Sequence, residues 1–254
     1  MFNRLLIIGC GLIGSSILRA ASSKKLSKKI FIYEKSNKNI SEVKKLKIPC
    51  QILKNLNKDI SDIDFVIMCT PMSEYHKIIP KLNAHLSSKS IITDVGSTKT
   101  NVLKLIKKQL EKKLKWIPSH PIAGSEVSGP EYGNKNLFLN KWCVIIREKT
   151  TNLKKLKVLK KFWKKLGSQV IFMNANSHDK IFSITSHLPH LIAYNLIKTA
   201  KDFEKIQKNS LIKFSAGGLR DFSRIAASNE IMWRDVFFSN KKNMVSAINL
   251  FTKN

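Results

Sequence analysis

The chain has 254 residues, of which 43% are hydrophobic and 25% are charged. This balance is ordinary for a globular protein and excludes wholesale disorder. No apolar run approaches the ~18 residues of a membrane-spanning helix. The short apolar run Leu5–Ile8 is interrupted at once by Gly9, so it is not the core of a signal peptide. The length allows one large domain, or one domain with a smaller partner.

Basic residues dominate the charge: 46 Lys and Arg stand against 17 Asp and Glu, a formal net charge of +29. Such an excess makes a nucleic-acid partner worth considering. Most of these residues are lysines on the polar sides of expected helices, for example within residues 104–115 and 154–165. We therefore favour a solvated lysine surface and expect no specific nucleic-acid partner. A non-catalytic basic protein that binds nucleic acid is kept as a remote alternative.

Four cysteines, Cys10, Cys50, Cys69 and Cys143, show no CxxC or Cys/His ligand spacing. Three of them lie in apolar, strand-like runs. This pattern favours reduced, buried thiols in a cytoplasmic protein over disulfides or zinc, and we expect no metal site.

The first two-thirds of the chain alternates short apolar runs with helical patterns. Strands are expected at Leu5–Ile8, Lys29–Tyr33, Phe65–Cys69, Ser90–Val95, Lys115–Pro118, Trp142–Arg147 and Val170–Asn174, and helices at Gly14–Ser22, Asn101–Leu114 and Lys154–Leu166. Nearly continuous apolar strands separated by helices are typical of an α/β fold with a doubly wound, mostly parallel sheet.

From about Asn176 onward the strand-like runs stop. Helices are expected at Asp179–Ala200, Lys205–Phe214, Phe222–Ala227 and Arg234–Phe251. The change of pattern predicts an α/β domain over residues 1–175, followed by a smaller all-α domain over residues 176–254.

A glycine motif, Gly9-Cys10-Gly11-Leu12-Ile13-Gly14, follows the first strand and opens a helix. Gly9 permits a tight turn, Gly11 lets the backbone approach a pyrophosphate, and Gly14 lets the helix pack closely on the strand. These features predict a Rossmann-type NAD(P)-binding domain.

An acid, Glu34, ends the second strand, where it can accept hydrogen bonds from the adenosine ribose. It favours NAD because a carboxylate repels a 2′-phosphate, although Lys35 beside it is compatible with NADP. Thr70 and Pro71 follow the Phe65–Cys69 strand at the ligand-binding edge. The expected cofactor-binding residues are Gly9, Gly11, Leu12, Ile13, Gly14, Glu34, Thr70 and Pro71.

Two further segments, Thr93–Lys99 and Ser119–Glu126, each follow an expected strand and so reach the same edge of the sheet. The second segment contains His120, which taken alone is as compatible with a structural loop histidine as with a catalytic one. The helical part contains Ser186–His190, with two histidines three residues apart, and Gly217–Ala226, a glycine-led helix start with two arginines four residues apart.

Together these segments resemble the prephenate/arogenate dehydrogenases of tyrosine biosynthesis. The resemblance runs from Leu5 to roughly Ser246. It rests on GCGLIGSS, TDVGSTK, SHPIAGSE, SHLPH and GGLRDFSRIA in this order, followed by IMWRD at Ile231–Asp235.

The resemblance implies oxidative decarboxylation of prephenate to 4-hydroxyphenylpyruvate, with hydride transfer from C4 of the ring to NAD⁺ and loss of CO2 from C1. A base of near-neutral pKa at the C4 hydroxyl is needed, and histidine suits that role. The motif match assigns it to His120, with Ser97 sharing the hydroxyl contact and orienting the imidazole.

The resemblance also assigns substrate-binding residues. Arg224 matches the arginine that binds a substrate carboxylate, a role that suits its planar charged fork. His190 is the first choice for a substrate contact and His187 the second. Glu126 resembles a gating acid and Trp233 a supporting aromatic, although a purely structural role is as compatible with both. Asp221 is expected to support Arg224.

The remaining histidines, His76, His85 and His178, match no family motif and are interpreted as surface or helix residues. A serine hydrolase is not supported because no G-x-S-x-G motif is present. The nearest alternative is arogenate dehydrogenase, with NAD or NADP, which differs only in the substrate side chain.

The helical segment of about eighty residues buries little core alone, so a homodimer through it is expected. Since the sequence ends at Asn254, we expect no tyrosine feedback through a separate regulatory domain.

Overall fold

The computed structural model describes residues 1–57, 60–208 and 212–254. They form two compact units. The first comprises Met1–Gly124 and Ser128–His178, and the second comprises Ser125–Val127 and Asp179–Asn254. The domain boundary after residue 175 stays a prediction.

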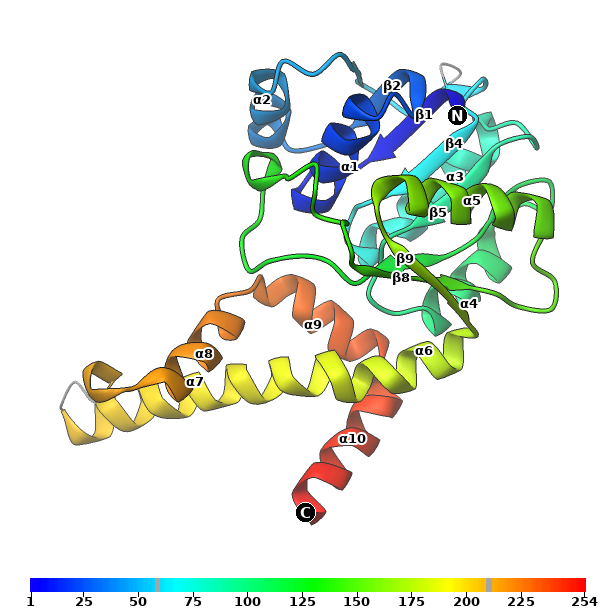
Figure 1. Ribbon diagram of the computed structural model, residues 1–254. Coiled ribbons are helices and arrows are strands. Elements are labelled where there is room, and N and C mark those ends of the chain that lie inside the picture. The colour runs from blue at the N-terminus through cyan, green and yellow to red at the C-terminus, as the bar shows by residue number, and fades with distance from the viewer. Residues whose placement is uncertain (58–59, 209–211) are drawn as a thin grey trace. The chain divides into compact units, whose positions relative to one another are not determined.

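The first unit is built on a six-stranded parallel sheet (Figure 1). In spatial order its strands are β3 (Gln51–Leu53), β2 (Ser27–Tyr33), β1 (Phe2–Ile8), β4 (Phe65–Met68), β5 (Ile91–Asp94) and β6 (Lys115–Trp116). The order changes direction between β1 and β4. Open sheets bind ligands at such a switch point, outside the carboxyl ends of the strands.

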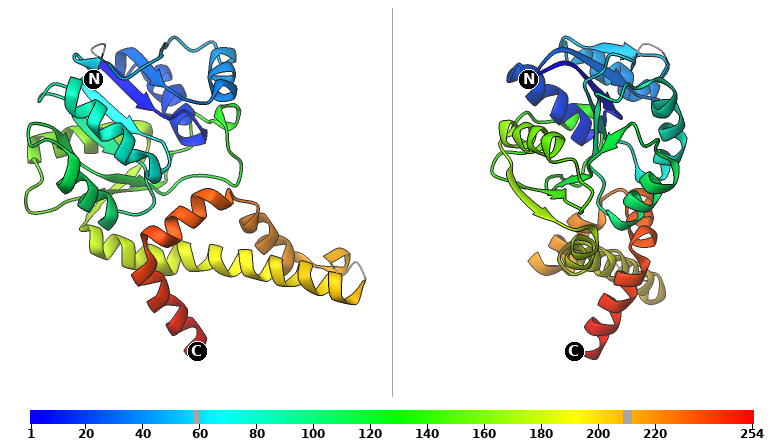
Figure 2. Two further views of the ribbon diagram at one scale, coloured as in Figure 1. Left: turned by 180° about the vertical axis from the view of Figure 1, so that it is seen from behind. Right: turned by 90° about the vertical axis from the view of Figure 1, so that its right-hand side faces the viewer.

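Helices cover both faces of this sheet. Since successive residues of β1 point to opposite faces, this strand contributes to a core on each side. Leu5 and Ile7 join one core with α1 (Leu12–Ser23) and α5 (Leu153–Leu166). Leu6 and Ile8 join a second core with α3 (Tyr75–His85) and α4 (Thr100–Gln109). The edge-on view in the right panel of Figure 2 shows the helices of the first unit on the two sides of the sheet. The near-continuous apolar strands of the sequence are thus explained.

A second, three-stranded sheet completes the first unit. It contains β7 (Ser119–Pro121), β8 (Trp142–Ile146) and β9 (Gln169–Met173), in that order. β7 and β8 are antiparallel, whereas β8 and β9 are parallel. The strand pattern had indicated the β8 and β9 segments but not their separation from the main sheet, since periodicity does not say which strands pair.

The second unit is helical. It contains the end of α6 (Ala175–Phe182), a π-helical turn over Ser183–His187, α7 (Leu188–Gln207), α8 (Gly217–Ala226), α9 (Glu230–Ser239) and α10 (Lys241–Lys253). None of the described helices combines the length and hydropathy needed to cross a membrane.

Several element predictions differ from the structure. The expected helix Arg234–Phe251 is two helices, because the chain breaks at Asn240. The expected helix Lys205–Phe214 is wrong in part: α7 ends at Gln207, a 3-10 turn covers Ile212–Phe214, and 209–211 lie outside the described residues. The elements α2 (Asn37–Lys45), β3, α3 and β7 were not predicted. The strands β3 and β7 are short, α2 buries only Val43, and α3 contains Pro80, a residue that disfavours a helix interior.

Candidate active site

The glycine turn at the end of β1 has the geometry that its sequence requires. Gly9 has φ +87°, a left-handed conformation that favours glycine. Its amide donates to the Tyr33 carbonyl oxygen at 2.8 Å, which joins the turn to β2. A Cβ on Gly14 would lie 2.1 Å from the Gly9 carbonyl oxygen. Both glycines are therefore needed to bring α1 against the strand.

The second glycine of the motif, Gly11, faces open space. Gly11 precedes the first residue of α1, and a Cβ built on it meets nothing within 4 Å. No side chain caps this helix start, so Leu12 and Ile13 begin a helix whose amides are available to an anion. The turn fits a pyrophosphate.

Nearby at the same sheet edge, Thr70 follows β4 and packs its methyl group beside Gly9. Its Oγ1 is buried, and among the described residues it has no hydrogen-bond partner. A buried hydroxyl without a partner next to the glycine turn fits a bound polar group. Pro71 follows directly and precedes the turn into α3.

Glu34 directly follows β2 and is held by three backbone amides. Its Oε2 accepts from Cys10 N at 2.8 Å, and its Oε1 accepts from Lys35 N and Ser36 N at 2.8 and 2.9 Å. These bonds fix the carboxylate beside the glycine turn. Lys35 itself is paired with Glu74, at 2.7 Å, rather than with Glu34.

His120 is half-buried on β7. Its Nδ1 lies 2.9 Å from Nε2 of His178, and the ring centroids are 5.1 Å apart. The preceding residue, Ser119, donates from its hydroxyl to the carbonyl oxygen of Asp94 at 2.8 Å. Since Asp94 ends β5, His120 lies at the carboxyl edge of the main sheet, the edge that also carries the glycine turn.

Ser97 is half-buried in the loop after β5. Within the described part of the chain, its hydroxyl makes no hydrogen bond to His120. The predicted orienting contact between these two side chains is therefore absent here, and the His120 ring is bonded to His178 instead.

A buried ion pair supports this loop. Lys99 Nζ donates to Asp94 Oδ2 at 2.5 Å and to the Ser119 carbonyl oxygen at 2.6 Å, and both charged side chains are fully buried. Trp116 donates to the other Asp94 oxygen at 3.2 Å, and Trp163 donates to the Ser119 hydroxyl at 3.1 Å. The network connects the loop that carries Ser97 to the strand that carries His120.

In the second unit, Arg224 of α8 forms a short ion pair with Glu126. Both side chains are partly exposed. The expected support of Arg224 by Asp221 is not seen, since no ion pair joins these two residues in the described part of the chain. Glu126, 98 positions away in the sequence, takes that place.

His190 and Trp233 stack, with ring centroids 3.6 Å apart and planes 20° apart. His190 Nδ1 lies 2.9 Å from the Ser186 carbonyl oxygen. A carbonyl only accepts, so Nδ1 carries the proton and Nε2 is the acceptor of the neutral ring. Burial lowers the pKa of His190, which favours this neutral form.

His187 lies in the π-helical turn and is buried. Its Nδ1 is 3.1 Å from Nδ2 of the buried Asn240, which also donates to the Asp179 carbonyl oxygen at 2.7 Å. The two histidines, predicted to line one wall, thus have different surroundings. The His187 side chain is buried against Asn240, whereas the His190 side chain is half-buried.

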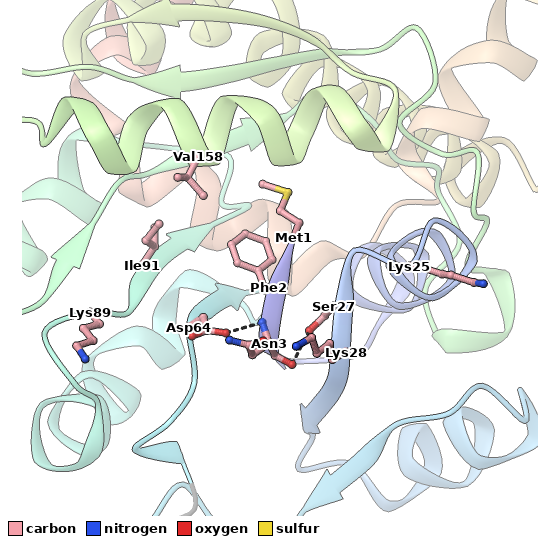
Figure 3. Close-up of a pocket in the computed structure, with 10 residues that line it drawn as sticks. All are labelled: Met1, Phe2, Asn3, Lys25, Ser27, Lys28, Asp64, Lys89, Ile91 and Val158. Atoms are coloured by element: carbon pink, nitrogen blue, oxygen red, sulfur yellow. Dashed lines mark hydrogen bonds between the residues drawn. The ribbon is translucent and has the colours of Figure 1, made fainter.

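A separate hollow of about 780 Å³ lies at the opposite, amino end of β1, where Met1, Phe2 and Asn3 border it (Figure 3). None of the predicted site residues lines it. Asn3 N donates to Asp64 at 2.6 Å there. In residues 1–57, 60–208 and 212–254, no group of three His, Cys, Asp or Glu side chains is arranged to hold a metal ion.

The strand order, the glycine turn and the acid that follows β2 define a dinucleotide-binding protein of the Rossmann class. Two family models match the chain: the nucleotide-binding domain of prephenate dehydrogenase matches residues 18–172, and the dimerization domain of prephenate dehydrogenase matches residues 174–254.

Similar proteins agree with these matches. The chain is 30% identical over 251 residues to a cyclohexadienyl dehydrogenase of Zymomonas mobilis, covering 99% of this chain and 85% of that one. It is 32% identical to a prephenate dehydrogenase of Lactococcus lactis, covering 99% and 69%. A crystal structure of prephenate dehydrogenase from A. aeolicus, in complex with hydroxyphenyl propionate and NAD⁺, superposes with a TM-score of 0.89 at 34% identity, covering 98% and 87%. This chain belongs to the prephenate/arogenate dehydrogenase family of oxidoreductases, so the resemblance seen in the sequence is confirmed.

The sequence did not indicate that His178 belongs to the candidate site, and it was interpreted as a surface or helix residue. It does lie on α6, but its side chain is fully buried. Helical spacing was the available signal, because Ala175 (i−3) and Phe182 (i+4) lie on the same face and are both buried. Its pairing with His120 had no signal in the sequence.

Proposed function

We propose that this chain is an NAD-dependent prephenate dehydrogenase that converts prephenate to 4-hydroxyphenylpyruvate and CO2. The observation that carries the proposal is the half-buried His120 imidazole at the sheet edge that also bears the open glycine turn. The family and the relatives named above support the same reaction.

The cofactor proposal rests on the glycine turn and Glu34. Gly9, Gly11 and Gly14, with the first residues of α1, would hold the pyrophosphate, and Thr70 and Pro71 would border it. Glu34, fixed as an acceptor by three amides, would bind the ribose hydroxyls and disfavour a 2′-phosphate. When bound, NAD⁺ accepts the hydride that leaves C4 of the ring.

For the chemistry we propose that His120 Nε2 takes the proton of the C4 hydroxyl. C4 then becomes carbonyl-like, and the electrons of the bond to the C1 carboxylate enter the ring as CO2 leaves. The C4 oxygen regains its proton from His120. Ser97 would contact the same hydroxyl.

For substrate binding we propose Arg224 as the residue that holds a carboxylate, with Glu126 as its partner when no substrate is bound. His190 is preferred over His187 because its ring is half-buried and offers Nε2 as an acceptor. Trp233 would hold the His190 ring by stacking.

Arogenate is the second candidate substrate. The Zymomonas relative is named for the cyclohexadienyl ring rather than for the side chain that distinguishes the two substrates. Assays of prephenate and arogenate, each with NAD⁺ and NADP⁺, test the proposal. We expect the highest kcat/KM for prephenate with NAD⁺ and one CO2 released per NADH. A preference for arogenate or NADP⁺ would replace that part of the proposal.

The most direct test of the chemistry is His120→Asn. We expect kcat to fall by about 10²–10⁴-fold, because the base is lost, while the affinity for NAD⁺ is unchanged. Steady-state kinetics and calorimetric titration of NAD⁺ measure the two quantities. Near-normal turnover would remove the proposed mechanism.

We also propose a homodimer that assembles through residues 176–254, in line with the dimerization-domain match over 174–254. A reducing, cytoplasmic setting is proposed because all four cysteines are free thiols.

A further inference from the structure

We propose that His178 is a positioning residue that sets the tautomer of His120, an inference that rests on the proposed role of His120 as the base. The observation is the 2.9 Å contact between His120 Nδ1 and His178 Nε2. His178 lies in none of the sequence motifs on which the family resemblance rests, so no motif assigns it a role.

The contact allows two proton arrangements. If His178 donates from Nε2, His120 Nδ1 is the acceptor, and the neutral His120 ring carries its proton on Nε2. If His120 donates from Nδ1, its Nε2 has the lone pair and His178 Nε2 is the acceptor. Only the second arrangement gives a neutral ring whose Nε2 can take a proton.

The surroundings of His178 hold its ring in contact with His120, and the proposed role of His120 as the base requires the second arrangement. The His178 side chain is fully buried, so water does not compete for the contact. The helix start that carries it is fixed within the first unit: the Asn174 side chain caps Ser177 N at 2.8 Å, and Glu148 accepts from Ala175 N at 3.1 Å. The His178 amide donates to the Asn174 carbonyl oxygen at 3.1 Å.

The pairing also supports the charged form of His120 during turnover. Once Nε2 has taken the proton, the ring is a cation whose Nδ1–H donates to a neutral acceptor. Charge-assisted hydrogen bonds of this kind are shorter and stronger than neutral ones. No proton needs to leave the pair, so His178 acts through His120 rather than on substrate.

The experiment reads the tautomer directly. Nitrogen-15 NMR of histidine-labelled protein, with His120 assigned from its loss in His120→Asn, distinguishes a protonated Nδ1 from a protonated Nε2. We expect a protonated Nδ1 in the unmodified chain and a loss of this preference in His178→Leu. A protonated Nε2 on neutral His120 in the unmodified chain overturns the inference, whatever the activity.

Kinetics complete the test. His178→Leu is expected to lower kcat about 100-fold with KM for prephenate within about twofold, because the wrong tautomer removes the base without altering binding. In His178→Gln, the glutamine Oε1 can accept a hydrogen bond near the position of the His178 Nε2 atom, so this variant is expected to recover most of kcat. It also provides a test if the Leu variant does not fold. Equal loss of kcat in a folded Gln variant, or unchanged kcat in a folded Leu variant, overturns the inference.

His76→Gln is the matched control, since His76 is exposed on α3 of the same unit, and it should change neither the His120 signal nor kcat. The two proposals fail differently. Normal turnover of His120→Asn contradicts the proposed function, whereas the tautomer result tests the pairing without any turnover.

Discussion

Gly14 and Gly11 belong to one motif but have different surroundings. A Cβ on Gly14 would lie 2.1 Å from a backbone oxygen, whereas a Cβ on Gly11 would meet nothing within 4 Å. We therefore infer that the fold requires Gly14, and we propose that Gly11 is required by a bound ligand.

This contrast gives a paired prediction. Gly14→Ala should lower the free energy of unfolding by about 1–3 kcal/mol, since the added methyl forces a backbone shift. Gly11→Ala should leave stability unchanged but weaken NAD⁺ binding tenfold or more, because the methyl occupies the space a pyrophosphate needs. Urea unfolding and calorimetric titration measure the two effects, and equal NAD⁺ affinity in Gly11→Ala would contradict the cofactor proposal.

Burial distinguishes two Lys–Asp pairs of similar length. Lys99 and Asp94 are fully buried at 2.5 Å, while Lys198 and Asp202 are largely exposed at 2.6 Å. Removing one partner of a buried pair leaves an uncompensated charge. We expect Lys99→Met to cost about 3–5 kcal/mol of unfolding free energy in urea titrations. Lys198→Met is the control and should show no measurable change, because water already screens that pair. Similar stabilities for the two variants would argue against a structural role for the buried pair.

At the scale of elements, the break between α9 and α10 has a specific cause. Amphipathic spacing continues from Arg234 to Phe251 and predicts one helix. In the structure Asn240 is buried at the break, donates to the Asp179 carbonyl oxygen, and contacts His187. A side-chain bond to residue 179 is invisible to a periodic pattern.

We therefore expect Asn240→Ala to lower the free energy of unfolding by about 1–3 kcal/mol, because the buried hydrogen bond from Asn240 to the Asp179 carbonyl oxygen is lost. Asn249→Ala, at an exposed position of α10, is the matched control and should be neutral. Thermal or urea unfolding provides the measurement. A neutral Asn240→Ala would show that the bond does not stabilise the helix break.

At the scale of the whole molecule, apolar side chains are exposed on α9 and α10. Phe238, Val245, Leu250 and Phe251 are 70%, 47%, 55% and 54% exposed. Beside them, α7, α9 and α10 form a hollow of about 380 Å³ with a largely apolar lining. Exposed apolar surface of this kind marks interaction sites, and a second copy of the chain is the proposed partner.

Sedimentation should give twice the 28.9 kDa mass of one chain. The double variant Leu250→Glu and Phe251→Glu should shift the protein to monomers, because charge is costly in a desolvated interface. Tyr132→Glu, which is 52% exposed in the first unit, should remain dimeric. A monomeric unmodified chain would contradict the proposed dimer. A double variant that remains dimeric would show that Leu250 and Phe251 do not lie in the dimer interface.

Features that neighbouring residues encode could be predicted from the sequence. Gly9 to Gly14 specify a turn and a close helix approach through their own backbone conformation, and the apolar runs specify strands buried on both faces. Motif order along the chain identified the family. Only the folded chain shows the partners of the candidate site side chains: His120 is hydrogen-bonded to His178 rather than to Ser97, and Arg224 pairs with Glu126 rather than with Asp221. A hydrogen bond forms only where its donor and acceptor atoms meet in space. These pairs are 58 and 98 positions apart, so only the packing of the folded chain brings them together.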